Sequence, residues 1–189
     1  WIMGQIGIYG ACYKLSIIMS LFIQAFKFAA EPFFFSKMNR SDAKQTYATV
    51  LNVYTLFLLT VFLGVVAYMD ILQYFVGKQY RIGLNIVPIL LMANLCLGVY
   101  YNLSIWYKVS DKTIYGAYIS IIGAIITLLM NCLLVPKFGY IGAAWTTLLC
   151  YVSIMLLCYF IGQKYYPVNY PIKRLMLYTF FALLLFGLM

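Results

Sequence analysis

The chain has 189 residues, of which 66% are apolar and only 9% are charged, and its formal net charge is +9. A soluble domain has about 45–50% apolar and about 25% charged residues, so this composition excludes a soluble globular protein and predicts an all-α polytopic membrane protein. The sequence has no histidine and only four scattered carboxylates, which excludes histidine-dependent triads and zinc motifs and predicts no enzyme, no catalytic residue, no metal site and no cofactor.

Six apolar runs are long enough to cross a membrane, because a transmembrane helix needs about 20 mainly apolar residues. Residues 71–76 are apolar but too few to span, and we expect them to form an interfacial turn of helix before Gly77. The five cysteines stand singly in apolar runs without a CxxC motif, so we expect small buried hydrophobic residues. The six predicted spans cover about residues 8–30, 46–69, 83–107, 113–135, 139–162 and 172–189.

The basic residues predict the orientation of these spans. Counted on alternate sides, nine lie on one side and three on the other, with Lys14 left inside the first run. The positive-inside rule places the larger group in the cytoplasm, with loops 31–45, 108–112 and 163–171. Charges dispersed in short loops argue against nucleic-acid binding. The larger group is Lys27, Lys37, Arg40, Lys44, Lys108, Lys112, Lys164, Lys173 and Arg174; the smaller is Lys78, Arg81 and Lys137.

The first run holds charged residues that suggest transport. A cation at the membrane centre costs at least ~2.5 kcal/mol, so Lys14 either lines a water-filled cavity that attracts an anion or snorkels to the nearby outer interface. Lys27 and Glu31 are four residues apart and share a helix face with Gln24. They form either an interfacial ion pair or a gate or coupling-ion site at the inner mouth. Lys14 and Lys27 are about 140° apart on an ideal helix, so one cavity holds both only if the helix bends or the cavity wraps around it.

Two later runs carry polar stripes. In the third, Asn94, Gly98 and Tyr101 share a face and Asn102 lies beside it. In the fourth, small and weakly polar residues recur at spacings of three or four up to Asn131. Such stripes form either close helix–helix contacts or the polar wall of a cavity. The stripe of the fourth run consists of Gly116, Ser120, Gly123, Thr127 and Asn131.

Three stretches resemble a known family: residues 7–15 (GIYGACYKL), 25–34 (AFKFAAEPFF) and 131–147 (NCLLVPKFGYIGAAWTT). Together they are similar to the C-terminal half of the polysaccharide-biosynthesis flippases of the multidrug/oligosaccharidyl-lipid/polysaccharide exporter superfamily, in the form associated with Bacteroidetes-type bacteria. The resemblance extends over nearly the whole chain. The third stretch, a hairpin between the fourth and fifth spans, is the most specific of the three.

The resemblance implies a two-lobe exporter of the bacterial inner membrane that works by alternating access. Residues 1–189 would form a single transmembrane region, the six-helix C-terminal lobe, and the N-terminal lobe would lie in preceding sequence. The substrate would be an undecaprenyl-diphosphate-linked oligosaccharide, moved from the cytoplasmic to the outer leaflet for O-antigen, capsule or exopolysaccharide, with Na⁺ or H⁺ as a possible coupling ion. The first span would be about the eighth helix, and this even number agrees with the out-to-in direction expected from the charges.

The chemistry of such a substrate suggests a role for each polar candidate. Lys14 would meet the diphosphate or an acidic sugar, and Tyr101, Asn102 and Asn131 would offer hydrogen bonds or aromatic surface to sugar rings. A drug or cation antiporter of the same superfamily is the alternative, although it would need carboxylates deep in the spans. A membrane-embedded glycan polymerase or ligase is a further alternative, although it would need a large outer loop.

Overall fold

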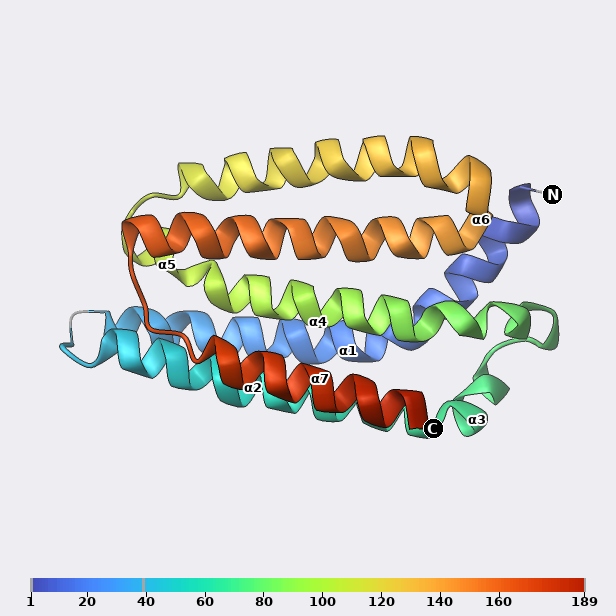
Figure 1. Cartoon of the computed structure of the whole chain (residues 1–189), viewed down its shortest axis with the longest axis horizontal. Coiled ribbons are helices and arrows are strands. Elements are labelled where there is room, and N and C mark those ends of the chain that lie inside the picture. Colours follow the sequence, from blue (N-terminus) through green and yellow to red (C-terminus); the bar gives the residue numbers. More distant parts are fainter. Residues whose placement is uncertain (1, 39, 189) are drawn as a thin grey trace.

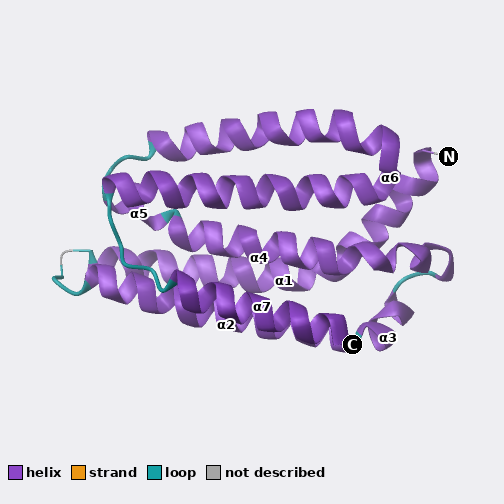
Figure 2. Cartoon of the chain, in the orientation of Figure 1, coloured by secondary structure: helices purple, strands orange, loops and turns teal. Residues whose placement is uncertain are grey.

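The computed structural model describes residues 2–38 and 40–188, and within these residues the chain is built of helices joined by short turns (Figures 1 and 2). Two of the elements, η1 and η2, are 3₁₀-helical. The elements are α1 (Ile2–Lys37), α2 (Ala43–Ala67), α3 (Met69–Leu72), η1 (Gln73–Phe75), η2 (Lys78–Ile86), α4 (Val87–Leu103), α5 (Ile105–Val109), α6 (Ile114–Tyr165) and α7 (Ile172–Leu188).

The prediction of an all-helical chain is confirmed, and four helical stretches are long and apolar enough to cross a membrane. The outside of the bundle is apolar: the side chains of Phe28, Leu128 and Phe180 are 74%, 67% and 62% exposed. Such a surface is stable against lipid rather than water. The four stretches are Gly4–Lys37, Ala43–Ala67, Lys78–Val109 and Ile114–Tyr165.

Helix α6 reverses direction at Gly139, so that residues 114–138 and 140–165 form two antiparallel legs (Figure 1). Gly139 has φ 58° and ψ −133°, a combination that glycine adopts but L-residues strongly disfavour. Three residues later the legs approach closely, because a Cβ atom at Gly142 would lie 2.5 Å from the carbonyl oxygen of Leu134. The small residues of this turn therefore allow close packing.

The core centres on α4, which packs against α1, α2 and α6 and lies between them in Figure 1. Leu90 and Leu91 of α4 are fully buried. Gly98 gives α2 room to approach, since a Cβ atom there would lie 2.6 Å from a methyl carbon of Leu58. Helix α7 packs mainly on α2. Helix α4 therefore connects α6 on one side of the bundle with α1 and α2 on the other.

The helix boundaries differ from the predicted spans at several places. The first predicted span stops at residue 30, but α1 continues through Pro32 to Lys37. Phe34 is 2% exposed and packs edge-to-face on Tyr47, with 5.1 Å between ring centroids, and the Tyr47 hydroxyl donates to the Phe34 carbonyl oxygen at 3.1 Å. These contacts hold the helix together beyond Pro32, which removes one helical hydrogen bond.

Smaller differences from the predicted spans occur at other places in the chain. The third predicted span begins as 3₁₀-helix, and α-helix starts only at Val87. Pro88 lies in the first turn of α4, where its missing N–H leaves no bond unmade. The apolar residues after Tyr68 form α3 and η1, so the predicted turn of helix is confirmed. Four cysteines are buried as expected, whereas Cys132 is exposed on the first leg of α6.

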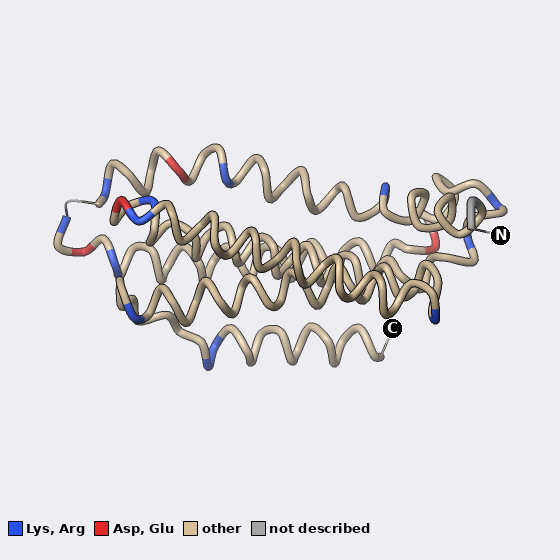
Figure 3. Tube along the Cα trace, turned by 90° about the horizontal axis from the view of Figure 1, so that it is seen from above, with Lys and Arg blue, Asp and Glu red and all other residues tan. Residues whose placement is uncertain are grey.

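The charges gather at the two ends of the bundle, and the middle of most helices carries none (Figure 3). One end holds the loops around Arg40, Lys112 and Tyr166, and the other holds η1, η2 and the reversal at Gly139. The two groups of basic residues counted from the sequence therefore lie at opposite ends, with the larger group at the first of these. Helix α1 is the exception, since Lys14, Lys27 and Glu31 lie along its length.

Candidate functional site

A cavity of about 530 Å³ lies between α1 and α4. We call it the α1–α4 cavity. Ile17, Leu21, Phe28 and Leu97 supply part of its apolar lining. Its polar lining consists of Tyr13, Ser20, Gln24 and Lys27 from α1 and Asn94 and Tyr101 from α4.

Helical periodicity explains why these polar side chains meet. Residues 13, 17, 20, 24 and 27 of α1 recur at spacings of four and three, and residues 94, 97 and 101 of α4 do the same. Each set therefore occupies one face of its helix. Two such faces turned towards each other bring amide, hydroxyl and ammonium groups together along one side of an otherwise apolar bundle. Polar side chains at membrane depth commonly mark a substrate path.

Lys27 is the cation of the α1–α4 cavity. Its Nζ atom lies 4.7 Å from the centroid of the Tyr101 ring on α4, which is within the range of an attractive cation–π interaction. The side chain is half-buried, and Gln24 lies almost one turn away on the same helix. The ring orients the ammonium group, and no hydrogen bond to another described residue occupies its N–H donors, which can therefore meet an anion.

Asn94 joins the two walls of the cavity. The Ser20 hydroxyl donates to Asn94 Oδ1 at 3.4 Å, and Asn94 Nδ2 donates to the Ser16 carbonyl oxygen at 3.3 Å. The Asn94 side chain is 3% exposed. Hydrogen bonds of this kind between membrane helices are worth roughly 0.6–2 kcal/mol, so Asn94 fixes the relative position of α1 and α4.

Tyrosines extend the polar surface towards α6. Tyr9 and Tyr13 stack with 5.9 Å between ring centroids, and the Tyr9 hydroxyl lies 3.3 Å from Thr147 Oγ1 on the second leg of α6. Tyr151 of the same leg is half-buried and packs against the core. Flat rings with hydroxyl groups provide both faces that stack on sugars and polar edges that hydrogen-bond to them.

Glu31 pairs with Lys108 of α5, whose ammonium group donates to Glu31 Oε1. The predicted Lys27–Glu31 ion pair is thus replaced by a pair between elements far apart in sequence. The two side chains are partly exposed, at 35% for Glu31 and 24% for Lys108. The pair links α1 to α5 about one turn beyond Lys27, on the side of the α1–α4 cavity nearer the more basic end of the bundle.

A double-mutant cycle tests this pairing. We expect Glu31→Gln and Lys108→Gln to show a coupling of about 0.5–1 kcal/mol in thermal unfolding, because the pair is only partly screened by solvent. Glu31→Gln combined with Lys27→Gln is expected to be additive, since Lys27 lies over Tyr101 instead. Coupling of Glu31 to Lys27 rather than to Lys108 would contradict this assignment.

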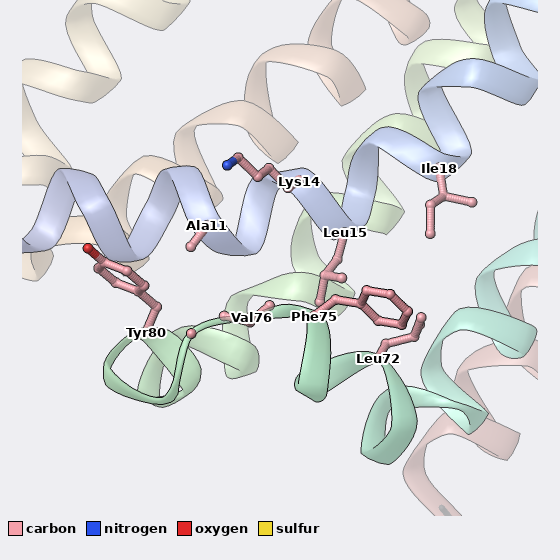
Figure 4. A pocket seen from close by; sticks show the side chains of 9 residues that line it. Ala11, Lys14, Leu15, Ile18, Leu72, Phe75, Val76 and Tyr80 are labelled. Carbon is pink, nitrogen blue, oxygen red and sulfur yellow. The ribbon is translucent and has the colours of Figure 1, made fainter.

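Lys14 lies in a different place. It lines a cavity of about 510 Å³ between α1 and the segment from α3 to η2, together with Leu72, Phe75 and Tyr80. Figure 4 shows the Lys14 side chain on the opposite side of the α1 ribbon from Phe75 and Leu72. Lys14 therefore does not line the α1–α4 cavity with Lys27. The two lysines point in different directions, as their angular separation suggested, and they are about 20 Å apart along α1.

The remaining candidates lie outside the α1–α4 cavity. Asn102 is 2% exposed, and neither its Oδ1 nor its Nδ2 has a hydrogen-bond partner among the described residues. Asn131 is half-buried on the first leg of α6. The structure thus brings together Gln24, Lys27 and Tyr101. Sequence reasoning missed Tyr13 and Ser20, although their spacing from Gln24 and Lys27 carried the signal.

Comparison of the chain with known proteins adds no evidence about its function to the geometry described above. No protein-family model matches the chain, and neither a curated protein nor a solved structure matches it significantly.

Proposed function

We propose that this protein transports a lipid-linked oligosaccharide, carried on undecaprenyl diphosphate, across the bacterial inner membrane to supply surface polysaccharide. The observation that carries the proposal is the α1–α4 cavity: a polar, tyrosine-rich cavity with one lysine that opens on the surface of an otherwise apolar bundle, beside the exposed side chains of Leu21 and Phe28. The resemblance of residues 131–147 to exporter sequences supports the same conclusion.

The lining of the cavity suits a sugar diphosphate. Lys27 attracts the negatively charged phosphate. This attraction is stronger in a low-dielectric surrounding than in water. Tyr13 and Tyr101 offer ring faces to the sugars, and Gln24 offers an amide that is free to donate and accept. The polar head group crosses a hydrocarbon layer roughly 30 Å thick, while the lipid tail stays in the bilayer beside the apolar outer faces of the helices.

The charge of the lining favours an anion over a cationic drug. Lys27 is the charged residue among the described residues that line the α1–α4 cavity, and no carboxylate is among them. Glu31, the nearest acidic residue along α1, is neutralised by Lys108. A cation antiporter needs a carboxylate at the substrate, so the oligosaccharide is the better substrate.

The architecture fits a lobe that crosses the membrane six times. Each leg of α6 would be one crossing, and α7 would be another. In this scheme the head group enters at the basic end near Lys27, gated by the Glu31–Lys108 pair, and leaves near Lys14 about 20 Å further along α1. The opposing wall would come from a second lobe, and rocking of the lobes would expose the substrate to each side in turn. Asn102 and Asn131 would contact substrate only in another state of that cycle.

Gene deletion in a strain that needs the protein for surface polysaccharide tests the proposal. We expect loss of surface polysaccharide together with accumulation of the complete lipid-linked precursor facing the cytoplasm, measured by glycan staining and lipid extraction. Reintroduction of the intact gene should restore export. Normal surface polysaccharide in the deletion strain would refute the proposal. Single repeat units that reach the surface unpolymerised would indicate a polymerase instead.

A further inference from the structure

A second polar cavity lies at the more basic end of the bundle, away from the proposed substrate path. It has a volume of about 630 Å³ and is formed by the start of α2 and the linker that leads into α7. Lys44, Thr49 and Asn52 line it from α2, and Asn169 and Arg174 line it from the linker and the first turn of α7. We call it the α2–α7 cavity.

The charges of the α2–α7 cavity favour a singly charged anion. Lys44 and Arg174 contribute two positive charges and Asp42 one negative charge, which leaves a net charge of +1. The Nζ atom of Lys44 is held 4.8 Å from the ring centroid of Tyr166, the residue that follows α6. Burial raises the pKa of Tyr166, so its hydroxyl stays neutral beside the ammonium group.

The cavity also contains an acceptor without a donor. Asn52 Oδ1 is buried and has no hydrogen-bond partner among the described residues. A buried carbonyl oxygen left without a donor is unfavourable, because it has lost its hydrogen bonds to water without a replacement. A turn of the Asn52 amide would bring this oxygen into the cavity. There it would accept from a ligand that carries hydroxyl groups next to its phosphate, while the phosphate meets the two cations.

Below the cavity, both helices continue with exposed apolar side chains on the same faces. Leu56 lies one turn after Asn52 on α2 and is 49% exposed. Phe181 and Leu185 lie seven and eleven residues after Arg174 on α7, which keeps them on its face, and they are 54% and 48% exposed. A ligand in the cavity that extends along the bundle therefore meets polar groups first and an apolar surface next.

We propose that the α2–α7 cavity binds an anionic phospholipid of the membrane whose headgroup carries hydroxyls, as phosphatidylglycerol does. The phosphate lies between Lys44 and Arg174, a headgroup hydroxyl donates to Asn52, and the acyl chains run along Leu56 and Phe181. Basic cavities at membrane-helix ends suit such headgroups, and each basic residue contributes about 1 kcal/mol. The assignment depends on this cavity alone and not on the substrate that the protein transports.

The test measures lipid binding by the full-length protein in detergent, by native mass spectrometry with dioleoylphosphatidylglycerol as the probe. Lys44→Gln together with Arg174→Gln is expected to weaken binding by about 25-fold, from about fivefold for each cation removed. Lys173→Gln is the matched control: it removes the same charge from the neighbouring residue, which does not line the cavity, and binding should stay within about twofold of wild type.

Further arms identify the ligand. Lys44→Arg with Arg174→Lys keeps both charges and should bind within a few-fold of wild type. If the double Gln variant does not purify, the single variants decide, each with an expected loss of about fivefold. Equal binding of phosphatidylcholine, equal loss in Lys173→Gln, or full competition by free glycerol phosphate would each overturn the assignment of a specific anionic lipid.

Discussion

Replacement of Lys27 by Gln is expected to lower transport of the lipid-linked oligosaccharide about ten- to hundredfold at normal protein level. A hydrogen bond to a charged group contributes about 1.5–3 kcal/mol, and each 1.4 kcal/mol corresponds to a factor of ten. Lys27 is the cation of the α1–α4 cavity, and Tyr101 holds it in place at 4.7 Å. The measurement is export of surface polysaccharide together with the amount of precursor retained inside.

Two variants make this result specific. Lys27→Arg keeps the charge and the stacking on Tyr101, and it should retain most of the activity. Lys37→Gln is the matched control, because Lys37 also lies on α1 above an aromatic ring, at 5.9 Å from Phe33, but outside the cavity. Normal export by Lys27→Gln, or an equal loss in Lys37→Gln, would remove Lys27 from the proposed substrate path.

The second large effect is expected on stability, from Gly139→Ala. Gly139 turns the two legs of α6 back on each other at φ 58° and ψ −133°. An L-residue in such a conformation costs about 1–3 kcal/mol. A Cβ atom there would also lie 2.0 Å from Gln5 Oε1, which must move. We therefore expect the midpoint of thermal unfolding to fall by about 2–4 °C per kcal/mol lost.

A glycine in an ordinary helical position serves as the control for Gly139. Gly64 of α2 has open space around the position of a Cβ atom, so Gly64→Ala should leave stability unchanged or raise it by up to about 1 kcal/mol. Tryptophan fluorescence of the purified variants in detergent provides the melting curves. If Gly139→Ala and Gly64→Ala have the same midpoint of thermal unfolding, the reversal at Gly139 does not depend on a glycine.

Hydropathy and charge predicted much of the fold. Runs of apolar residues located the long helices, and the hairpin expected within residues 131–147, between the fourth and fifth predicted spans, contains the reversal at Gly139. Helix ends were harder to predict, because they depend on contacts distant in sequence. The prediction for α1 stopped at residue 30, just before Pro32, whereas the packing of Phe34 on Tyr47 extends the helix to Lys37.

The candidate site was predictable along each helix but not across helices. Helical periodicity placed Gln24 and Lys27 on one face, and it separated Lys14 from them. Which residue faces Lys27 depends on the register and crossing angle of α1 and α4, and a single sequence contains neither. For the same reason Glu31 was assigned to its neighbour on α1 instead of to Lys108.

The tight reversal in α6 also bears on how the chain enters the membrane. The two legs join at Gly139 without a hydrophilic loop, and α6 is one apolar stretch of 52 residues. A long polar loop between the legs would have to cross the lipid during synthesis. Here the connection is a tight turn, and the charged residue next to it is Lys137. The legs can therefore partition from the translocation machinery into the bilayer together as a preformed helical hairpin, with the backbone polar groups of each leg already paired.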